Sequence, residues 1–367
     1  MDRRVAALLA MTDLCRPSLS LCIYAYPIRS ARYFPELLVS QLHKFIFDGL
    51  PVRGMLVQLT DTWTEILRRR ASNTQHGAYP APLRDMLGQM TAAATLMQSN
   101  IKFDGSLTMQ IMGDGPVKLA VVEVQPDLVL RATATLIGVL PEAASLSHMV
   151  NAHNQGRCAI TLDPKTKFPG QQPYQGVVPL FDDHGQPIEH LSEVLEHYML
   201  QSEQLDTTLV LAADANMAAG LLIQRLPVQG AGNLEGSMVS RENEDAIGRD
   251  EDYQRIAILA KTLKSEELLS LDAETILRRL FWEESLTRFE PLQGETGPRF
   301  ACSCSRERVA RMIVSLGADE AHSVIEERGE MEVACEFCGV QYRFDPVDTA
   351  QLFVDPTRQV APGSSAH

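Results

Sequence analysis

Apolar and polar residues between positions 41 and 226 follow two periods, one typical of helices and one typical of strands. Helices are predicted at Thr62–Arg70, Leu83–Ser99 and Ile188–Ser202. Strands are predicted at Met55–Leu59, Leu107–Ile111, Val117–Val124, Leu128–Leu136, Cys158–Leu162, Leu209–Ala213 and Leu221–Leu226. Because the strands cluster instead of alternating strictly with helices, we predict the α+β class, with a body of antiparallel sheets packed with helices over residues 41–226.

Two turn signals divide the strands of this body. Asp104-Gly105 between Ile101–Phe103 and Leu107–Ile111 predicts a β-hairpin. Gly113-Asp114-Gly115-Pro116 predicts a second turn, just before Val117. The Gly113-x-Gly115 pair lacks the third glycine of a dinucleotide-binding fingerprint, so it is interpreted as a turn only.

Residues 227–295 differ from the body in composition and charge. Three glycines near the start lie among polar residues, and the segment has 8 lysines and arginines against 15 aspartates and glutamates, a net of −7. Two apolar faces at helical spacing follow, made by Ile256, Leu259, Ala260 and Leu263, then by Ile276, Leu277, Leu280 and Phe281. Asp272 is placed as an N-cap between them. We predict an acidic, amphipathic, helical linker that can dock on a neighbouring surface or detach from it.

A third unit is predicted over residues 296–350. Ser305 is placed as the N-cap of a helix that Gly317 ends, and a second helix is predicted at Glu320–Arg328. Glu332–Cys335 and Val340–Phe344 alternate like the strands of a hairpin. Residues 1–40, which lie before the body, are predicted to be a poorly ordered extension, with an arginine-rich transit peptide as the alternative, and residues 351–367 are predicted to be a tail.

The composition disfavours two classes of function, nucleic-acid binding and membrane insertion. The chain of 367 residues has 33 lysines and arginines against 47 aspartates and glutamates, a formal net charge of −14. Nucleic-acid binding is disfavoured because phosphate contacts need clustered cations. Membrane insertion is not expected, since the sequence has no run of 18 apolar residues.

Four of the seven cysteines lie close together in the third unit. Cys302-x-Cys304 is followed, thirty residues later, by Cys335-x-x-Cys338 and Gly339. Four thiolates satisfy a tetrahedral Zn²⁺ and leave no open position for water or substrate. We therefore predict one structural zinc at Cys302, Cys304, Cys335 and Cys338, and no hydrolytic metal chemistry. His322 lies between the two pairs, but the four cysteines already complete the ligand set.

Zinc matters more to this unit than to the body. A module of about 50 residues buries too little surface to be comfortably stable alone. Structural zinc contributes about 10–16 kcal/mol of apparent binding free energy to small folds. The module is therefore expected to fold with zinc and to unfold without it.

The same thiolates are targets of oxidants. Arg299, Arg306 and Arg308 are close in sequence to the first pair and are expected to stabilise negative sulfur. Within each pair the sulfurs are near enough for a local disulfide, which is tight for Cys302–Cys304 and easier for Cys335–Cys338. Neither bridge is compatible with four-thiolate ligation. The spacing alone is compatible with two hypotheses, a redox switch and a permanently reduced structural zinc.

The two cysteine motifs belong to a longer pattern. It comprises Cys302-Ser303-Cys304-Ser305-Arg306-Glu307-Arg308, Cys335-Glu336-Phe337-Cys338-Gly339, and upstream Val52-Arg53-Gly54, Lys102-Phe103-Asp104-Gly105, Gly113-Asp114-Gly115-Pro116 and Tyr174-Gln175-Gly176-Val177-Val178. With these motifs, in this order over about residues 41–350, the chain resembles the redox-regulated 33-kilodalton heat-shock chaperone family.

This resemblance implies a cytoplasmic, ATP-independent holdase and not an enzyme. Its reduced form would bind one Zn²⁺ through the four cysteines and be inactive. Oxidants such as peroxide or hypochlorous acid would convert the cysteines to two disulfides, which we assign to Cys302–Cys304 and Cys335–Cys338, and zinc would leave. The module and linker would then lose stability, and the active protein, typically a homodimer, would bind unfolding client proteins.

Two alternatives from other functional classes stay open at this point. A thiol–disulfide oxidoreductase using Cys335 and Cys338 predicts a βαβ context around the motif. A static zinc ribbon that binds nucleic acid predicts a basic surface with aromatic residues. Outside the motif, Cys158 is expected to be a small core residue. Cys15 and Cys22 could mispair on oxidation, and His190 and His197 are expected to be surface or packing residues.

Overall fold

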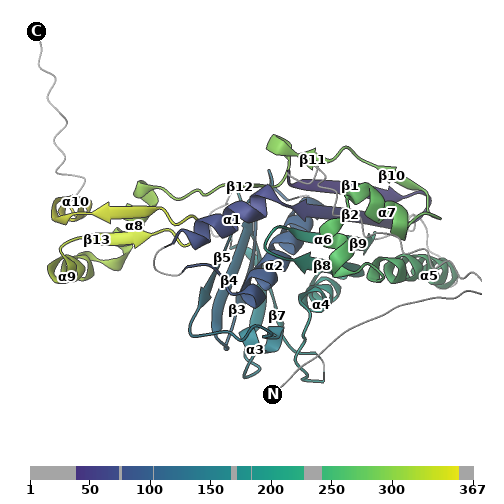
Figure 1. Ribbon diagram of the computed structural model, residues 1–367, viewed down its shortest axis with the longest axis horizontal. Coiled ribbons are helices and arrows are strands. Elements are labelled where there is room, and N and C mark those ends of the chain that lie inside the picture. The colour runs from purple at the N-terminus through teal and green to yellow at the C-terminus, as the bar shows by residue number, and fades with distance from the viewer. Residues whose placement is uncertain are drawn as a thin grey trace, which may run out of the picture. The chain divides into compact units, whose positions relative to one another are not determined.

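The computed structural model describes residues 39–73, 77–101, 103–166, 172–182, 184–226 and 242–354 (Figure 1). The predicted N-terminal extension up to residue 38, with Cys15 and Cys22, lies outside the described residues. So do Lys102, the glycine-rich start of the linker at 227–241, and the tail from residue 355.

The first sheet of the body is antiparallel and has the strand order β10-β1-β2-β9-β8, with β11 also pairing with β1. Its strands are β1 (Gln41–Phe47), β2 (Val52–Leu59), β8 (Thr207–Ala213), β9 (Ala218–Arg225), β10 (Leu286–Arg288) and β11 (Leu292–Gln293). Strands β2 and β9 are buried on both faces, which explains why their sequences are almost continuously apolar.

The second sheet has the strand order β12-β5-β4-β3-β6-β7. Its strands are β3 (Gly105–Met112), β4 (Val117–Val124), β5 (Val129–Leu136), β6 (Arg157–Pro164), β7 (Tyr174–Pro179) and β12 (Arg299–Phe300). All pairs are antiparallel except β12 with β5, which is parallel. Since β12 comes after the linker, this pairing brings the chain back to the body immediately before the first cysteine pair.

Helix α2 packs against strands of both sheets and forms the centre of the main core (Figure 1). The helices of the body are α1 (Asp61–Ala71), α2 (Ala81–Asn100), α3 (Leu146–Val150) and α4 (Leu191–Glu203). Residues Met90–Met97 of α2 are all buried. The hydroxyls of Thr91 and Thr95 within this stretch donate to backbone oxygens one turn earlier, so neither hydroxyl is buried without a hydrogen-bond partner.

The linker helices cover the other face of the first sheet. They are α5 (Glu242–Lys261), α6 (Ser265–Ser270) and α7 (Ala273–Leu280). Side chains alternate along a strand, so Val57 faces the core of α2 while Leu56 faces a second core shared with the linker. Ile256 of α5 and Ile276 of α7 are fully buried in that second core. The predicted apolar stripes of the linker are therefore its packing faces.

The C-terminal part combines three helices with a hairpin. They are α8 (Arg306–Leu316), α9 (Ala318–Arg328), β13 (Met331–Ala334), β14 (Gln341–Phe344) and α10 (Pro346–Leu352). Ser305 accepts a hydrogen bond from the backbone N–H of Arg308, as the sequence predicts, and Gly329 ends α9 in a left-handed conformation. The buried apolar core is small and consists of Ile313, Ala321, Met331 and Phe344.

The structure confirms the α+β class and most predicted elements, but the hairpin at Asp104-Gly105 is wrong. Helix α2 runs to Asn100, and the described residues between α2 and Asp104 form no strand. Gly105 begins β3 and lies so close to β6 that a Cβ would be 2.3 Å from the Asp163 carbonyl oxygen. The glycine therefore serves strand pairing and not a hairpin turn.

Residues 286–293 also differ from the sequence-based expectation. The sequence places them in the helical linker, yet Leu286–Arg288 forms β10 and Leu292–Gln293 forms β11, which extend the first sheet beside β1. The turn at Gly113–Pro116 is confirmed, because the Gly113 N–H donates to the Lys118 carbonyl between β3 and β4.

Candidate metal centre

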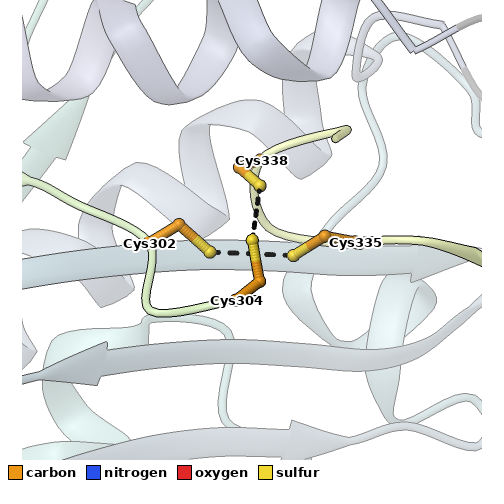
Figure 2. Close-up of side chains that lie close together, drawn as sticks. All are labelled: Cys302, Cys304, Cys335 and Cys338. Atoms are coloured by element: carbon orange, nitrogen blue, oxygen red, sulfur yellow. Dashed lines mark hydrogen bonds between the residues drawn. The ribbon is translucent and has the colours of Figure 1, made fainter. Parts of the chain in front are cut away.

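The four cysteines of the C-terminal part come from two loops that meet. Cys302 and Cys304 lie between β12 and α8, and Cys335 and Cys338 lie in the turn between β13 and β14. All four Sγ atoms are within 4.8 Å of one another. Figure 2 shows the sulfurs converging, with Cys302 Sγ 3.7 Å from Cys335 Sγ and Cys304 Sγ 3.2 Å from Cys338 Sγ.

Local backbone contacts hold the second loop. The Cys335 N–H donates to the Val340 carbonyl and the Gly339 N–H donates to the Cys335 carbonyl, at 2.9 and 2.8 Å. Gly339 has φ +71°, a left-handed conformation that glycine adopts without a Cβ penalty. The hairpin therefore folds back after Cys338 and keeps both sulfurs of the turn on one side.

The donor set and its spacing fit one metal ion. Tetrahedral zinc with bonds of about 2.3 Å to sulfur holds its sulfurs about 3.8 Å apart. The separations of 3.2 and 3.7 Å are slightly below this value and all others are within 4.8 Å, and four sulfur donors are typical of zinc or iron–sulfur sites. All four thiols are free, and no other group of potential metal ligands occurs in the described part of the chain. The four cysteines can therefore hold a metal ion.

The environment favours a negative charge at one sulfur. Burial opposes ionisation of Cys304, but hydrogen bonds from the Tyr342 hydroxyl, 3.1 Å away, and from the other thiols lower its pKa to about 7. Burial raises the pKa of Cys335 and of Cys338. Without a metal, the site thus favours a thiolate at Cys304 over one at Cys335 or Cys338, whereas a bound cation would favour thiolates at all four positions.

The arginines that the sequence suggested do not contact sulfur in the structure. Arg299 pairs with Asp127, Arg306 pairs with Asp348, and Arg308 donates to the Ser303 hydroxyl. The guanidinium that reaches a cysteine is that of Arg131 on β5, whose Nη1 is 3.8 Å from Cys302 Sγ. No sequence signal could have found it, because 171 residues separate the two and only the β5–β12 pairing brings them together.

The remaining candidates lie outside the centre. His322 on α9 contacts the ring of Phe353 and is not part of the cysteine cluster. Cys158 in β6 is completely buried, and burial raises the pKa of its thiol to about 12, as expected of a core residue. His190 precedes α4 as its N-cap residue and His197 lies within α4, remote in the fold from any cysteine cluster in the described residues.

The chain combines an α+β body, packed linker helices and a four-cysteine module, and this combination is characteristic of one protein family. Residues 40–345 match the model of the family described as Hsp33 protein, so the chain belongs to the Hsp33 family. This agrees with the resemblance seen in its motifs, and members of the family are named as chaperonins.

Relatives match over almost their full length. The chain is 43% identical to the 33 kDa chaperonin of Chromobacterium violaceum over 313 residues, which is 85% of this chain and 93% of that one. It is 36% identical to the 33 kDa chaperonin of Neisseria meningitidis over 326 residues, 88% of this chain and 95% of that one. The crystal structure of the 33 kDa chaperonin (heat shock protein 33 homologue) of Thermotoga maritima shares the fold, with a TM-score of 0.63 at 20% identity, covering 86% of this chain and 97% of that one.

Family membership makes this chain a chaperone. In the described residues, none of the helices has the length and apolar character needed to span a bilayer.

Proposed function

We propose that this chaperone is an ATP-independent holdase that is switched by the redox state of the four cysteines. In the resting state Cys302, Cys304, Cys335 and Cys338 would hold one zinc ion, and client binding would be off. Oxidation would join Cys302 to Cys304 and Cys335 to Cys338, and the ion would leave. The convergence of four free sulfurs at the junction of two loops is the observation that carries this proposal.

The oxidation step is a two-electron reaction for each disulfide. Two thiolates lose two electrons and form one S–S bond, while hydrogen peroxide takes up these electrons with two protons and leaves as two water molecules. Two equivalents of peroxide therefore oxidise the whole centre. Zinc itself does not change its redox state and would supply only the clamp that holds four thiolates together.

The pairing of the disulfides determines what happens to the fold. Two sulfur contacts join the different loops, Cys302 with Cys335 at 3.7 Å and Cys304 with Cys338 at 3.2 Å. Disulfides across the loops would keep the two loops joined, as the metal does. Disulfides within each loop would leave no link between the first loop and the hairpin, so this pairing supports a switch that loosens the module.

The module has little else to stabilise it. Its buried apolar core comprises four residues, of which Ile313, Met331 and Phe344 are large. The contribution of structural zinc, about 10–16 kcal/mol, exceeds what such a core provides. Loss of the ion is therefore expected to unfold the module, whose chain continues directly from the linker.

The linker covers the surface that we propose for clients. Beneath α5–α7, one face of the first sheet presents large apolar side chains, including Phe45, Phe47, Leu56, Leu221 and Ile223. Detachment of the helices would expose this face together with their own apolar stripes. A contiguous apolar surface of this kind binds unfolded chains without a nucleotide.

The other partners follow from the same proposal. We propose that the oxidised protein acts as a homodimer in the cytoplasm, bound to unfolding proteins and not to nucleic acid or membranes.

The oxidoreductase alternative loses support, because Cys335 and Cys338 lie in a β-hairpin turn and not in a βαβ unit. A static zinc module remains the alternative that experiment must separate.

One experiment tests the switch. Reduced, zinc-loaded protein is treated with peroxide at mildly raised temperature while zinc release and the light scattering of an unfolding client are followed together. Release should precede suppression of scattering, and a Cys158→Ser variant should behave like the parent protein. Equal suppression by the reduced, zinc-loaded form would refute the switch, and retention of zinc under oxidation would favour the static module.

A further inference from the structure

Arg131 of β5 connects the body to the cysteine centre. Its Nε and Nη2 donate to Glu123 Oε2 on β4 at 3.0 and 2.6 Å, and its Nη1 lies 3.8 Å from Cys302 Sγ. Its guanidinium carbon lies 4.3 Å from the centre of the Phe337 ring. The side chain is 19% exposed, so these contacts are largely shielded from water.

A second contact involves the same strand and the same loop. The hydroxyl of Thr133 donates to the Glu336 carbonyl at 2.9 Å. Arg131 and Thr133 are two residues apart on β5 and therefore share one face of the sheet. Glu336 and Phe337 are the two residues between Cys335 and Cys338, so this face of β5 binds the Cys-x-x-Cys turn directly.

These contacts act on both loops of the centre at once. The Arg131 side chain contacts the first cysteine pair through Cys302 and the second pair through Phe337. Glu123 occupies two donors of the guanidinium and fixes its plane, which a planar five-donor group permits and an ammonium does not. Stacking on Phe337 and the approach of a cation to sulfur both favour the arrangement in which the four sulfurs converge.

We propose that Arg131 is a positioning residue of the cysteine centre, which holds the two loops in register against β5 and couples their state to the body. This inference rests on the proposed metal switch. It adds a contact through which the cysteine centre is connected to the second sheet of the body. When Cys302 turns toward Cys304 to form a disulfide, its sulfur leaves the guanidinium, and Arg131 no longer joins the first loop to the turn at Phe337.

The surface beside this contact gives reagents access to it. A cavity of about 290 Å³ is lined by Arg131, Cys302, Ser303, Arg308 and residues of β4 and β5. Its volume admits a peroxide molecule or part of a chelator. Removal of the arginine side chain would widen this opening next to Cys302, so it should accelerate both metal loss and oxidation.

Three variants of the full chain test the proposal in the reduced, zinc-loaded state. Arg131→Ala should transfer zinc to a competing chelator about tenfold faster than the parent protein, and Arg131→Lys, which keeps the charge but loses the fork and the stacking, should lie between them. Arg157→Ala is the matched control, because Arg157 on β6 of the same sheet stacks on Phe181 and is not part of the four-cysteine centre.

Hydrogen exchange and a double-mutant cycle separate positioning from general destabilisation. Exchange of the Glu336–Gly339 amides should rise in Arg131→Ala while that of β3 and β6 stays unchanged. The effects of Arg131→Ala and Phe337→Ala on zinc transfer should be clearly non-additive, since each removes the same contact. Should Arg131→Ala fold poorly, Arg131→Lys and Thr133→Val carry the test.

The outcomes are distinct from those of the proposed function. Parental zinc transfer and parental amide exchange in the Arg131 variants would overturn the role of Arg131, as would full additivity with Phe337→Ala. Retention of zinc by oxidised parental protein would overturn the switch instead, and the measurements on reduced protein would still decide whether Arg131 positions the centre.

Discussion

The phenol of Tyr253 on α5 and the hydroxyl of Thr208 on β8 share a buried hydrogen bond of 3.0 Å. It is a polar contact at the edge of the second core, where the linker meets the first sheet. If the linker left the sheet, both oxygens would form hydrogen bonds with water instead. The bond therefore stabilises docking only while both hydroxyls are present, and loss of either one leaves the other buried without a partner.

Replacement of Tyr253 by phenylalanine should therefore weaken linker docking by about 1–2 kcal/mol, because the Thr208 hydroxyl stays buried without its partner. Amide exchange over the described part of α5 should accelerate by roughly 5- to 30-fold. The double variant with Thr208→Val is the control and should recover part of the loss. Exchange at the parental rate in Tyr253→Phe would show that the bond does not hold the linker.

The same tyrosine makes docking sensitive to alkaline pH. Burial raises the pKa of Tyr253 from 10.0 to about 12. Because the docked pKa is the higher one, docking has its full stability below about pH 10 and weakens as pH rises through the range from 10 to 12. A difference titration of tyrosinate absorbance between the parent protein and Tyr253→Phe should show this ionisation near pH 12; a midpoint at pH 10 would contradict the buried setting.

Gly339 should contribute to metal retention. Its φ of +71° makes alanine unfavourable by about 1 kcal/mol or more, which should weaken zinc binding roughly fivefold in chelator competition. Asparagine tolerates this conformation better and should weaken binding less. Gly185→Ala is the matched control, since Gly185 has φ +75° in a loop of the body. A loss of zinc from Gly185→Ala equal to that from Gly339→Ala would indicate general destabilisation.

Cys158 should not react in the native protein. Its thiol is fully buried with a pKa raised to about 12, so hardly any reactive thiolate is accessible at neutral pH. After zinc removal, alkylation followed by peptide mass mapping should label the four cysteines of the centre first, and Cys158 only in denaturant. Labelling of Cys158 together with Cys304 would show that β6 opens in the native state.

The cluster of four cysteines could be predicted from sequence because its determinants are local. Cys302 and Cys304 lie two residues apart in one loop, Cys335 and Cys338 share a turn with Gly339, and Ser305 caps the helix that follows. Each signal depends on spacing alone. The helix faces of the linker were predictable for the same reason, as Ile276 and Leu280 repeat at helical spacing and are buried.

Features that depend on long-range pairing were not predictable. Arg131 reaches Cys302 only because β12 pairs with β5, and residues 286–293 become strands only because β1 is available beside them. The failed hairpin at Asp104-Gly105 has the same origin. Its turn signal is genuine in isolation, but the length of α2 and the close approach of β6 to Gly105 determine the local structure.

The most direct test of the account uses metal-free protein with its thiols intact. Zinc is removed by a chelator under reducing conditions, and amide exchange is measured over residues 296–354. The account predicts that protection of α8, α9 and the β13–β14 hairpin is lost while the sheets of the body stay protected. Unchanged protection of these elements in the metal-free, reduced protein would contradict it.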